Sequence, residues 1–311
     1  MTLAAWAVSS PSTGEGSFLL VPSPLRGEGQ GEGEHVSGGT GVPARVPVAN
    51  RIALVVEYDG TAYCGFQWQD GQPTVQDELE KAIWRLTSER TRVVATSRTD
   101  TGVHAKGQVV SFRTASTLRL SKFVSGLNYY LPADIAVKAA HRPAETFHVR
   151  RSAVSRQYEY RILNRPARSP LQGRQTWLVN GALNAELMGE ACRAFVGEHD
   201  FASFTSGSGT KIENTVRRVY RADVAREGEL VVFTIVASSF LPHQIRNMVG
   251  ALVRVGLGQM SVGDFCSIME QKQPGLAGPK APAAGLCLVR VNYPDPTCFS
   301  QPPLSPGRGP E

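Results

Sequence analysis

Residues 93–112 read VVATSRTDTGVHAKGQVVSF, a run of polar side chains between two apolar segments. The apolar segments, 93–96 and 109–112, have the β-branched composition that is typical of strands. The residues between them include Arg98 and Asp100, and a loop with only a structural role rarely needs so many charged and polar groups. The stretch therefore predicts two strands joined by a loop that carries chemistry.

Apolar periodicity on both sides of this loop predicts a mixture of strands and helices. Ser121 and Thr74 are expected to cap helices, since hydroxyl side chains accept hydrogen bonds from free backbone N–H groups. Strands are expected at 52–58, 93–96, 109–112, 135–138, 158–162, 217–224 and 230–236, and helices at 75–86, 121–130, 184–196, from 242 and after 261. The order repeats in two halves, which predicts an α+β fold of two ferredoxin-like α/β subdomains, at 51–150 and 151–295, with mainly antiparallel sheets.

The two ends of the chain have a different composition. Residues 1–50 contain nine Gly and five Pro, with the low-complexity run GEGQGEGE at 27–34, and residues 296–311 form a Pro-rich tail. Such a sequence buries too little apolar surface to offset its ordering entropy, so we expect 1–50 to be a disordered extension. A natural start downstream of this segment is one interpretation of the abrupt change in composition at Arg51.

Composition narrows the class of protein. The chain has 311 residues and a formal charge of +6, and the part outside 1–50 carries 31 basic and 23 acidic residues. A basic surface favours a phosphate-rich partner such as nucleic acid. The sequence has no apolar run of the roughly 20 residues that a membrane helix needs, and its five scattered cysteines lack the spacing of a zinc site. We expect a reduced, cytoplasmic protein with no membrane partner and no structural metal.

The tripeptide Asp-Thr-Gly at 100–102 also occurs in aspartic proteases. Those enzymes need two carboxylates that share one proton, whereas this chain has one copy and would have to dimerise around it. Arg98, two residues away, favours a charged carboxylate instead. A turn residue with no catalytic role is a third interpretation, because Asp-x-Gly sequences form tight turns.

Four segments together resemble the TruA-type tRNA pseudouridine synthases. SRTDTGVHAKGQVVSF (97–112) is similar to the segment that carries the catalytic aspartate of that family, although Ser97 and Thr101 stand where Gly and Ala are usual. EYDGTAYCGFQWQ (57–69), VSRQYEYRIL (154–163) and FLPHQIRNMVGALVRVG (240–256) resemble three further family blocks in the same order. The resemblance extends over about 51–295 and implies the pseudouridine synthase fold, with a central positively charged catalytic cleft.

The resemblance implies that uridine is isomerised to pseudouridine at positions 38, 39 and 40 of tRNA, without a cofactor. Asp100 is the implied catalytic carboxylate, which either attacks the ribose C1′ or takes a proton from C2′. Arg246 is expected to pair with Asp100 and to keep it ionised and correctly aimed. Tyr158 is expected to pack against the target base and to assist proton loss at C5, while Tyr160 is expected to be a core aromatic.

Substrate binding is expected to involve Arg98, Tyr158, His104 and Lys106. Arg98 would help to hold the flipped nucleotide, whereas His104 either contacts RNA or orients the loop through hydrogen bonds. Further backbone contacts are expected from Arg150, Arg151 and Arg156, and Phe240 and His243 are expected to line the cleft. The implied partners are the tRNA anticodon stem-loop and a second copy of the chain. A catalytically silent tRNA-binding module of the same fold stays open as an alternative.

Overall fold

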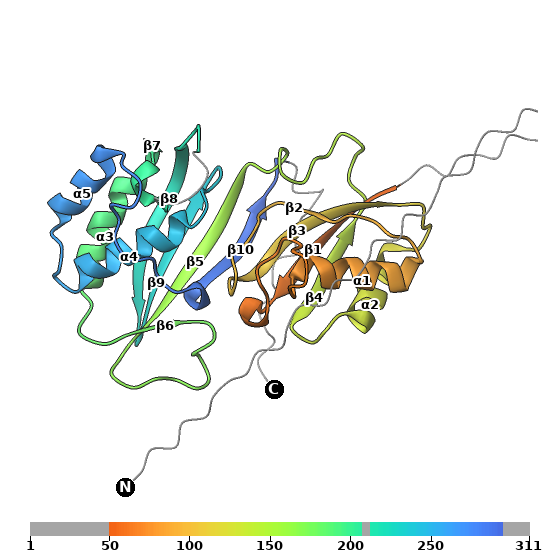
Figure 1. Cartoon of the computed structure of the whole chain (residues 1–311), viewed down its shortest axis with the longest axis horizontal. Helices are drawn as coiled ribbons and strands as arrows, with labels where there is room; N and C mark the ends of the chain where they lie inside the picture. The colour runs from red at the N-terminus through yellow and green to blue at the C-terminus, as the bar shows by residue number, and fades with distance from the viewer. Residues whose placement is uncertain (1–49, 207–211, 295–311) are drawn as a thin grey trace, which may run out of the picture. The chain divides into compact units, whose positions relative to one another are not determined.

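The structure of the chain is a computed structural model that describes residues 50–206 and 212–294 (Figure 1). The predicted low-complexity extension, apart from residue 50, and the predicted Pro-rich tail lie outside the described residues. In the part of the chain that the structure describes, no helix has the length and apolar character that crossing a membrane requires.

The first half of the described chain builds a four-strand arrangement with two helices. The elements are β1 (Asn50–Tyr58), η1 (Gly60–Ala62), α1 (Val75–Thr87), β2 (Val94–Ala95), β3 (His104–Thr114), α2 (Leu120–Tyr130) and β4 (Ile135–His141). Thr74 caps α1 as predicted, because its side chain accepts a hydrogen bond from the Asp77 N–H. The predicted Ser121 cap is wrong: α2 begins at Leu120 after Arg119, so Ser121 lies inside the first turn.

The second half repeats this alternation of helices and strands, as the sequence predicts. Its elements are β5 (Ser155–Asn164), β6 (Trp177–Val179), α3 (Ala185–Cys192), η2 (Arg193–Phe195), β7 (Gly197–Asp200), η3 (Ala202–Phe204), β8 (Val216–Glu227), β9 (Leu230–Ala237), α4 (Gln244–Gly256), α5 (Val262–Gln271), η4 (Ala283–Gly285) and β10 (Leu286–Asn292). Helix α5 begins with a capping box in which Ser261 and Asp264 exchange hydrogen bonds. These two side chains satisfy donors that the first turn leaves free.

The ten strands of the described residues belong to one sheet with the order β4-β1-β3-β10-β5-β9-β8-β7, while β2 pairs with β3 and β6 pairs with β5. Strand pairs are antiparallel except β10 with β3 and β5 with β6, which confirms the predicted mainly antiparallel α+β fold. The last strand, β10, therefore joins β3 of the first half to β5 of the second half. A subdomain boundary near residue 150 stays a prediction.

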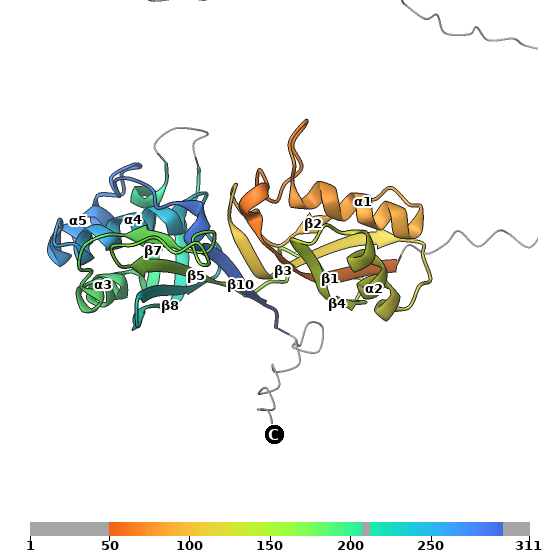
Figure 2. The ribbon, with the colours of Figure 1, turned by 90° about the horizontal axis from the view of Figure 1, so that it is seen from below.

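The two faces of the central strands differ in burial. Along β5, Tyr158, Tyr160 and Ile162 are buried, whereas Glu159 and Arg161 are half-buried. Successive strand residues point to opposite faces, so one face contributes to the core and the other is partly open. Figure 2 shows α1 and α4 on the same side of β3, β10 and β5.

Candidate active site

The segment with Asp100 forms a tight turn between β2 and β3. The N–H of Val103 donates to the backbone oxygen of Asp100 at 3.1 Å, and Gly102 has a φ of +77°. The hydroxyls of Thr99 and Tyr58 are hydrogen-bonded at 2.8 Å. These contacts fix the backbone on both sides of Asp100 and therefore the direction of its side chain.

The segment after β1 packs tightly against this turn. The N–H of Phe66 donates to the backbone oxygen of Thr99 at 3.1 Å. A Cβ at Gly60 would lie 2.1 Å from the backbone oxygen of Val103, and a Cβ at Gly65 would lie 2.8 Å from that of Thr99. Both distances are shorter than heavy atoms tolerate, so the close approach requires glycine at these two positions. The block at 57–69 thus supports the Asp100 turn.

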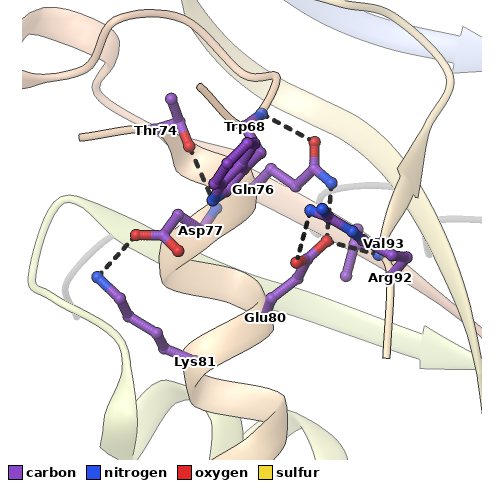
Figure 3. A network of polar contacts seen from close by, with 8 residues as sticks. All are labelled: Trp68, Thr74, Gln76, Asp77, Glu80, Lys81, Arg92 and Val93. Atoms are coloured by element: carbon purple, nitrogen blue, oxygen red, sulfur yellow. Dashed lines mark hydrogen bonds and ion pairs between the residues drawn. The ribbon is translucent and has the colours of Figure 1, made fainter. Parts of the chain in front are cut away.

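A hydrogen-bond network anchors the strand that enters the turn (Figure 3). Glu80 on α1 accepts from the N–H of Val93 at 2.9 Å and from the Gln76 side chain at 2.7 Å, and it forms an ion pair with Arg92 at 3.3 Å. Gln76 in turn accepts from the N–H of Trp68 at 3.0 Å. Helix α1 therefore holds both the segment at Val93, which enters the turn, and the segment at Trp68, which belongs to the block packed against the turn.

The side chain of Asp100 lines a cavity of about 440 Å³. The turn, the start of β5 and the start of α4 surround it, which brings three of the four sequence blocks together. The cavity is lined by Thr96, Ser97, Arg98, Thr99, Asp100, Val103, Arg150, Arg156, Tyr158, Ser239, Phe240, Leu241, Pro242, His243, Gln244, Ile245, Arg246 and Leu286. The lining includes four arginines and one carboxylate, so it carries an excess of positive charge.

The Asp100 carboxylate is held from α4. The guanidinium of Arg246 donates from Nη1 to Oδ2 at 3.3 Å and from Nε to the backbone oxygen of Ala281 at 2.8 Å. His243 places its Nε2 at 3.7 Å from the same Oδ2. The Arg246 side chain is 13% exposed and that of Asp100 is 25% exposed, so the ion pair is shielded while the carboxylate can still be reached from the cavity.

Tyr158 forms part of the cavity wall from β5. Its ring packs edge-on against Phe240, with ring centroids 5.2 Å apart and an interplanar angle of 83°. Burial raises the pKa of Tyr158 to about 12, against the effect of a hydrogen bond with Ser97. The phenol is therefore protonated at neutral pH. Tyr160 is fully buried and donates to the backbone oxygen of Pro282 at 2.7 Å, which confirms it as a core aromatic.

The basic residues named from the sequence have different environments. Arg98 is exposed and lines the cavity, as does Arg150, whose Nε donates to the backbone oxygen of Ala95 at 2.9 Å. Burial and the nearby charge of Arg98 lower the pKa of Arg150. Arg156 is buried and donates to three backbone oxygens, those of Ala153, Ser238 and Arg150. Arg156 thus supports the cavity wall rather than its mouth.

The structure places His104 and Lys106 away from the Asp100 cavity. Strand β3 begins at His104, which corrects the prediction that both residues follow in the polar loop. Both line a second cavity of about 350 Å³, together with Asp59. His104 is 6% exposed, and its Nδ1 accepts from the N–H of Gly60 at 3.1 Å and lies 3.1 Å from Asp59 Oδ1. These contacts hold the turn after β1.

The sequence predicts His243 only as a residue that lines the cleft and Arg150 only as an RNA-backbone contact, and it does not predict that they lie beside Asp100 and Arg98. His243 lies three positions before Arg246 at the start of a helix, and this spacing puts two side chains on one face. Arg150 had no local signal, because its place beside Arg98 depends on the packing of 144–154 against β2. The ranges 50–206 and 212–294 hold no group of three or more His, Cys, Asp or Glu side chains placed to bind a metal ion.

Comparison with known proteins agrees with this geometry. The sequence profile described as "tRNA pseudouridine synthase" matches residues 54–150 and 191–294. The chain is 41% identical over 245 residues to "tRNA pseudouridine synthase A" of Geobacter sp. (strain M21), covering 78% of this chain and 99% of the relative. It is 40% identical over 256 residues to the protein of the same name from Photobacterium profundum, covering 82% and 98%. The matched residues include the Asp100 turn and the helix of Arg246, and the chain belongs to the tRNA pseudouridine synthase family.

Proposed function

We propose that the chain isomerises uridine to pseudouridine at positions 38, 39 and 40 of the tRNA anticodon stem-loop, with Asp100 as the catalytic carboxylate. The observation that carries this proposal is the pairing of Asp100 with Arg246 inside a cavity lined by four arginines. Membership of the family supports the reaction and the substrate class. The protein acts in the cytoplasm, where tRNA is modified.

The reaction moves one bond and one proton. The bond between uracil N1 and ribose C1′ breaks, the base rotates, and C5 bonds to C1′, while the C5 proton is lost and N1 gains one. The Asp100 carboxylate either attacks C1′ or removes the C2′ proton, and both routes use an oxygen that faces the cavity. Arg246 holds the carboxylate in place, since a charge-assisted hydrogen bond restricts its rotation.

The target nucleotide has to leave its helical stack before Asp100 can reach C1′. Unstacking costs a few kcal/mol, which contacts to the flipped nucleotide must offset. The exposed Arg98 at the cavity mouth, together with Arg150, provides two cations for the RNA backbone. The Tyr158 ring lies beside the base, and its neutral hydroxyl donates a hydrogen bond rather than accepting the C5 proton.

We assign His104 and Lys106 roles outside the Asp100 cavity. His104 orients the turn after β1 through Gly60 and Asp59, which is the second of the two roles that the sequence left open. Lys106 is exposed on β3 and contacts the RNA backbone outside the Asp100 cavity. The chain acts as a homodimer; this part of the proposal rests on family resemblance, and sedimentation equilibrium tests it.

The reaction itself offers a direct assay. Unmodified tRNA that carries tritium at uracil C5 releases the label only when C5 forms the new bond. The wild-type protein should release label from positions 38, 39 and 40, whereas Asp100→Ala should release none and should still bind tRNA. Release by Asp100→Ala at the wild-type rate would refute the catalytic role. Binding without release by the wild type would favour the silent tRNA-binding module.

The aspartic protease interpretation has no support in the structure. In the described residues Asp100 pairs with Arg246, which favours an ionised carboxylate, whereas an aspartic protease needs two carboxylates that share one proton.

A further inference from the structure

His243 has an unusual backbone conformation at the start of α4. It is the N-cap residue, with φ +60° and ψ 0°, in the left-handed region. Three described residues other than glycine share a positive φ, and the other two, Ser88 and Lys272, end helices, where this conformation is common. His243 makes no side-chain capping hydrogen bond. The imidazole is instead directed to Ser206 and Asp100.

The imidazole of His243 lies between the hydroxyl of Ser206 and the carboxylate of Asp100. Its Nδ1 is 3.0 Å from the Ser206 hydroxyl, which orients the ring. Its Nε2 is 3.7 Å from Oδ2 of Asp100, the oxygen that also accepts from Arg246 at 3.3 Å. In the described residues, the other carboxylate oxygen, Oδ1, has no hydrogen-bond donor. Both neighbours therefore lie at one oxygen and leave the second open to the cavity.

We propose that His243 is a positioning residue for the reaction: with Arg246 it holds Oδ2 of Asp100 and leaves Oδ1 as the oxygen that reacts. Arg246 contacts Oδ2 from one direction and restricts the rotation of the carboxylate about its χ2 bond only in part. An imidazole on a second side of the same oxygen restricts this rotation. The inference rests on the proposed role of Asp100, and it adds a residue and an atom to that role.

The charge state of His243 follows from its neighbours. Burial lowers the pKa of the imidazole, and the cationic side chains of Lys280 and Arg246 lower it further, while Asp100 raises it. The net direction is downward, so the ring is neutral at neutral pH. When the pH falls through this lowered pKa, the ring gains a charge, and the imidazolium pairs with the carboxylate. An imidazolium beside Oδ2 makes the Asp100 carboxylate a weaker base and a weaker nucleophile, so activity should fall on the acid side.

Two substitutions separate the contact with Asp100 from the backbone conformation. His243→Asn keeps a residue that tolerates a positive φ and retains an amide near the position of Nδ1, but it cannot reach Asp100. His243→Gln places its amide nitrogen near the position of Nε2 and does not titrate. We would measure tritium release from C5-labelled tRNA under single turnover from pH 5.5 to pH 8.5, tRNA affinity by filter binding, and thermal unfolding of each variant.

We expect His243→Asn to lower the single-turnover rate about 10- to 100-fold while tRNA affinity changes by less than about threefold, because a misplaced reacting group reduces rate rather than binding. His243→Gln should restore the rate to within about fivefold of the wild type and should lose the part of the acid limb that the imidazole contributes. The Gln variant lacks the ring, so a purely structural role for the ring predicts no such recovery.

Other outcomes would overturn the proposal. These are a wild-type rate for His243→Asn, an equal loss in both variants with an unchanged pH profile, or a loss confined to tRNA affinity. A variant that unfolds below the assay temperature is replaced by Ser206→Ala, which keeps the imidazole but frees its orientation and should lower the rate by a smaller factor. If the wild type released no tritium, the proposed function itself would fail, and His243 would not be implicated.

Discussion

The Asp100 cavity and the cavity lined by His104, here the first and the second cavity, lie on opposite faces of the same central strands and differ in charge. Leu286 lines the first and its neighbour Cys287 lines the second, so adjacent residues of β10 point to different faces. The first cavity holds four arginines and one carboxylate, Asp100. The second holds two cations, Lys106 and Arg161, and the acidic residues Glu57, Asp59 and Asp134.

The difference shows which cavity suits a polyanion. In the second cavity the acids have partners within the protein: Lys138 pairs with Glu57 at 3.1 Å, and Tyr63 donates to Asp134 at 2.6 Å. In the first cavity Arg98 and Arg150 lie close enough for their charges to repel, and neither has an acidic partner in the described residues. Unpaired cations that lie close together are stabilised by an anion, and we propose that RNA phosphate supplies it.

The largest effect is expected at Arg246. In Arg246→Lys, one ammonium cannot reach both Ala281 and Asp100, whereas the guanidinium does. We expect the turnover rate to fall about 10- to 100-fold, since a hydrogen bond between charged groups contributes about 1.5–3 kcal/mol. Arg161→Lys is the matched control in the second cavity and should stay within about twofold of the wild type, because a half-exposed ion pair contributes about 0–1 kcal/mol. Equal losses would remove the distinction between the cavities.

A smaller effect is expected for tRNA affinity. Arg98→Ala and Arg150→Ala should each weaken binding about three- to tenfold and reduce the slope of log affinity against log salt by about one, the value for one lost phosphate contact. Lys106→Ala serves as the comparison. If it leaves the salt slope unchanged, the second cavity lies outside the RNA-binding surface; if it reduces the slope as much as Arg98→Ala, RNA contacts both faces.

The smallest effect is expected at Tyr158. Burial raises the pKa of Tyr158 to about 12 in the first cavity and that of Cys287 to about 11 in the second. Below the pKa, the fraction of Tyr158 present as phenolate increases tenfold per pH unit. If the phenolate were the base in catalysis, the rate would therefore rise from pH 7 to pH 10. We expect no such rise, and about a two- to tenfold loss in Tyr158→Phe from the missing hydrogen bond. Cys287→Ser should match the wild type.

Much of the fold could be predicted from local patterns. The strands at 52–58 and 230–236 and the capped helix after Thr74 follow from apolar periodicity and from a hydroxyl that accepts a backbone hydrogen bond. The Ser121 cap failed because the cap preference is small, and the helix gains more by starting one residue earlier, where Leu120 packs against the core. The sequence predicts a strand only over the apolar residues 109–112, but β3 begins at His104. Pairing with β1 continues back to Ala105, so the strand includes polar residues that have no strand pattern of their own.

The sequence by itself determined the chemical groups and their order: a carboxylate in a glycine turn, a tyrosine on a strand, and an arginine on an amphipathic helix. These depend on residues that are close neighbours along the chain. Only the tertiary structure decided that Asp100 meets Arg246, 146 positions away, and that His243 lies at the same oxygen. It also placed His104 on the other face of the sheet from Asp100. Such contacts depend on how strands pair and helices pack over long sequence distances, and no local preference encodes them.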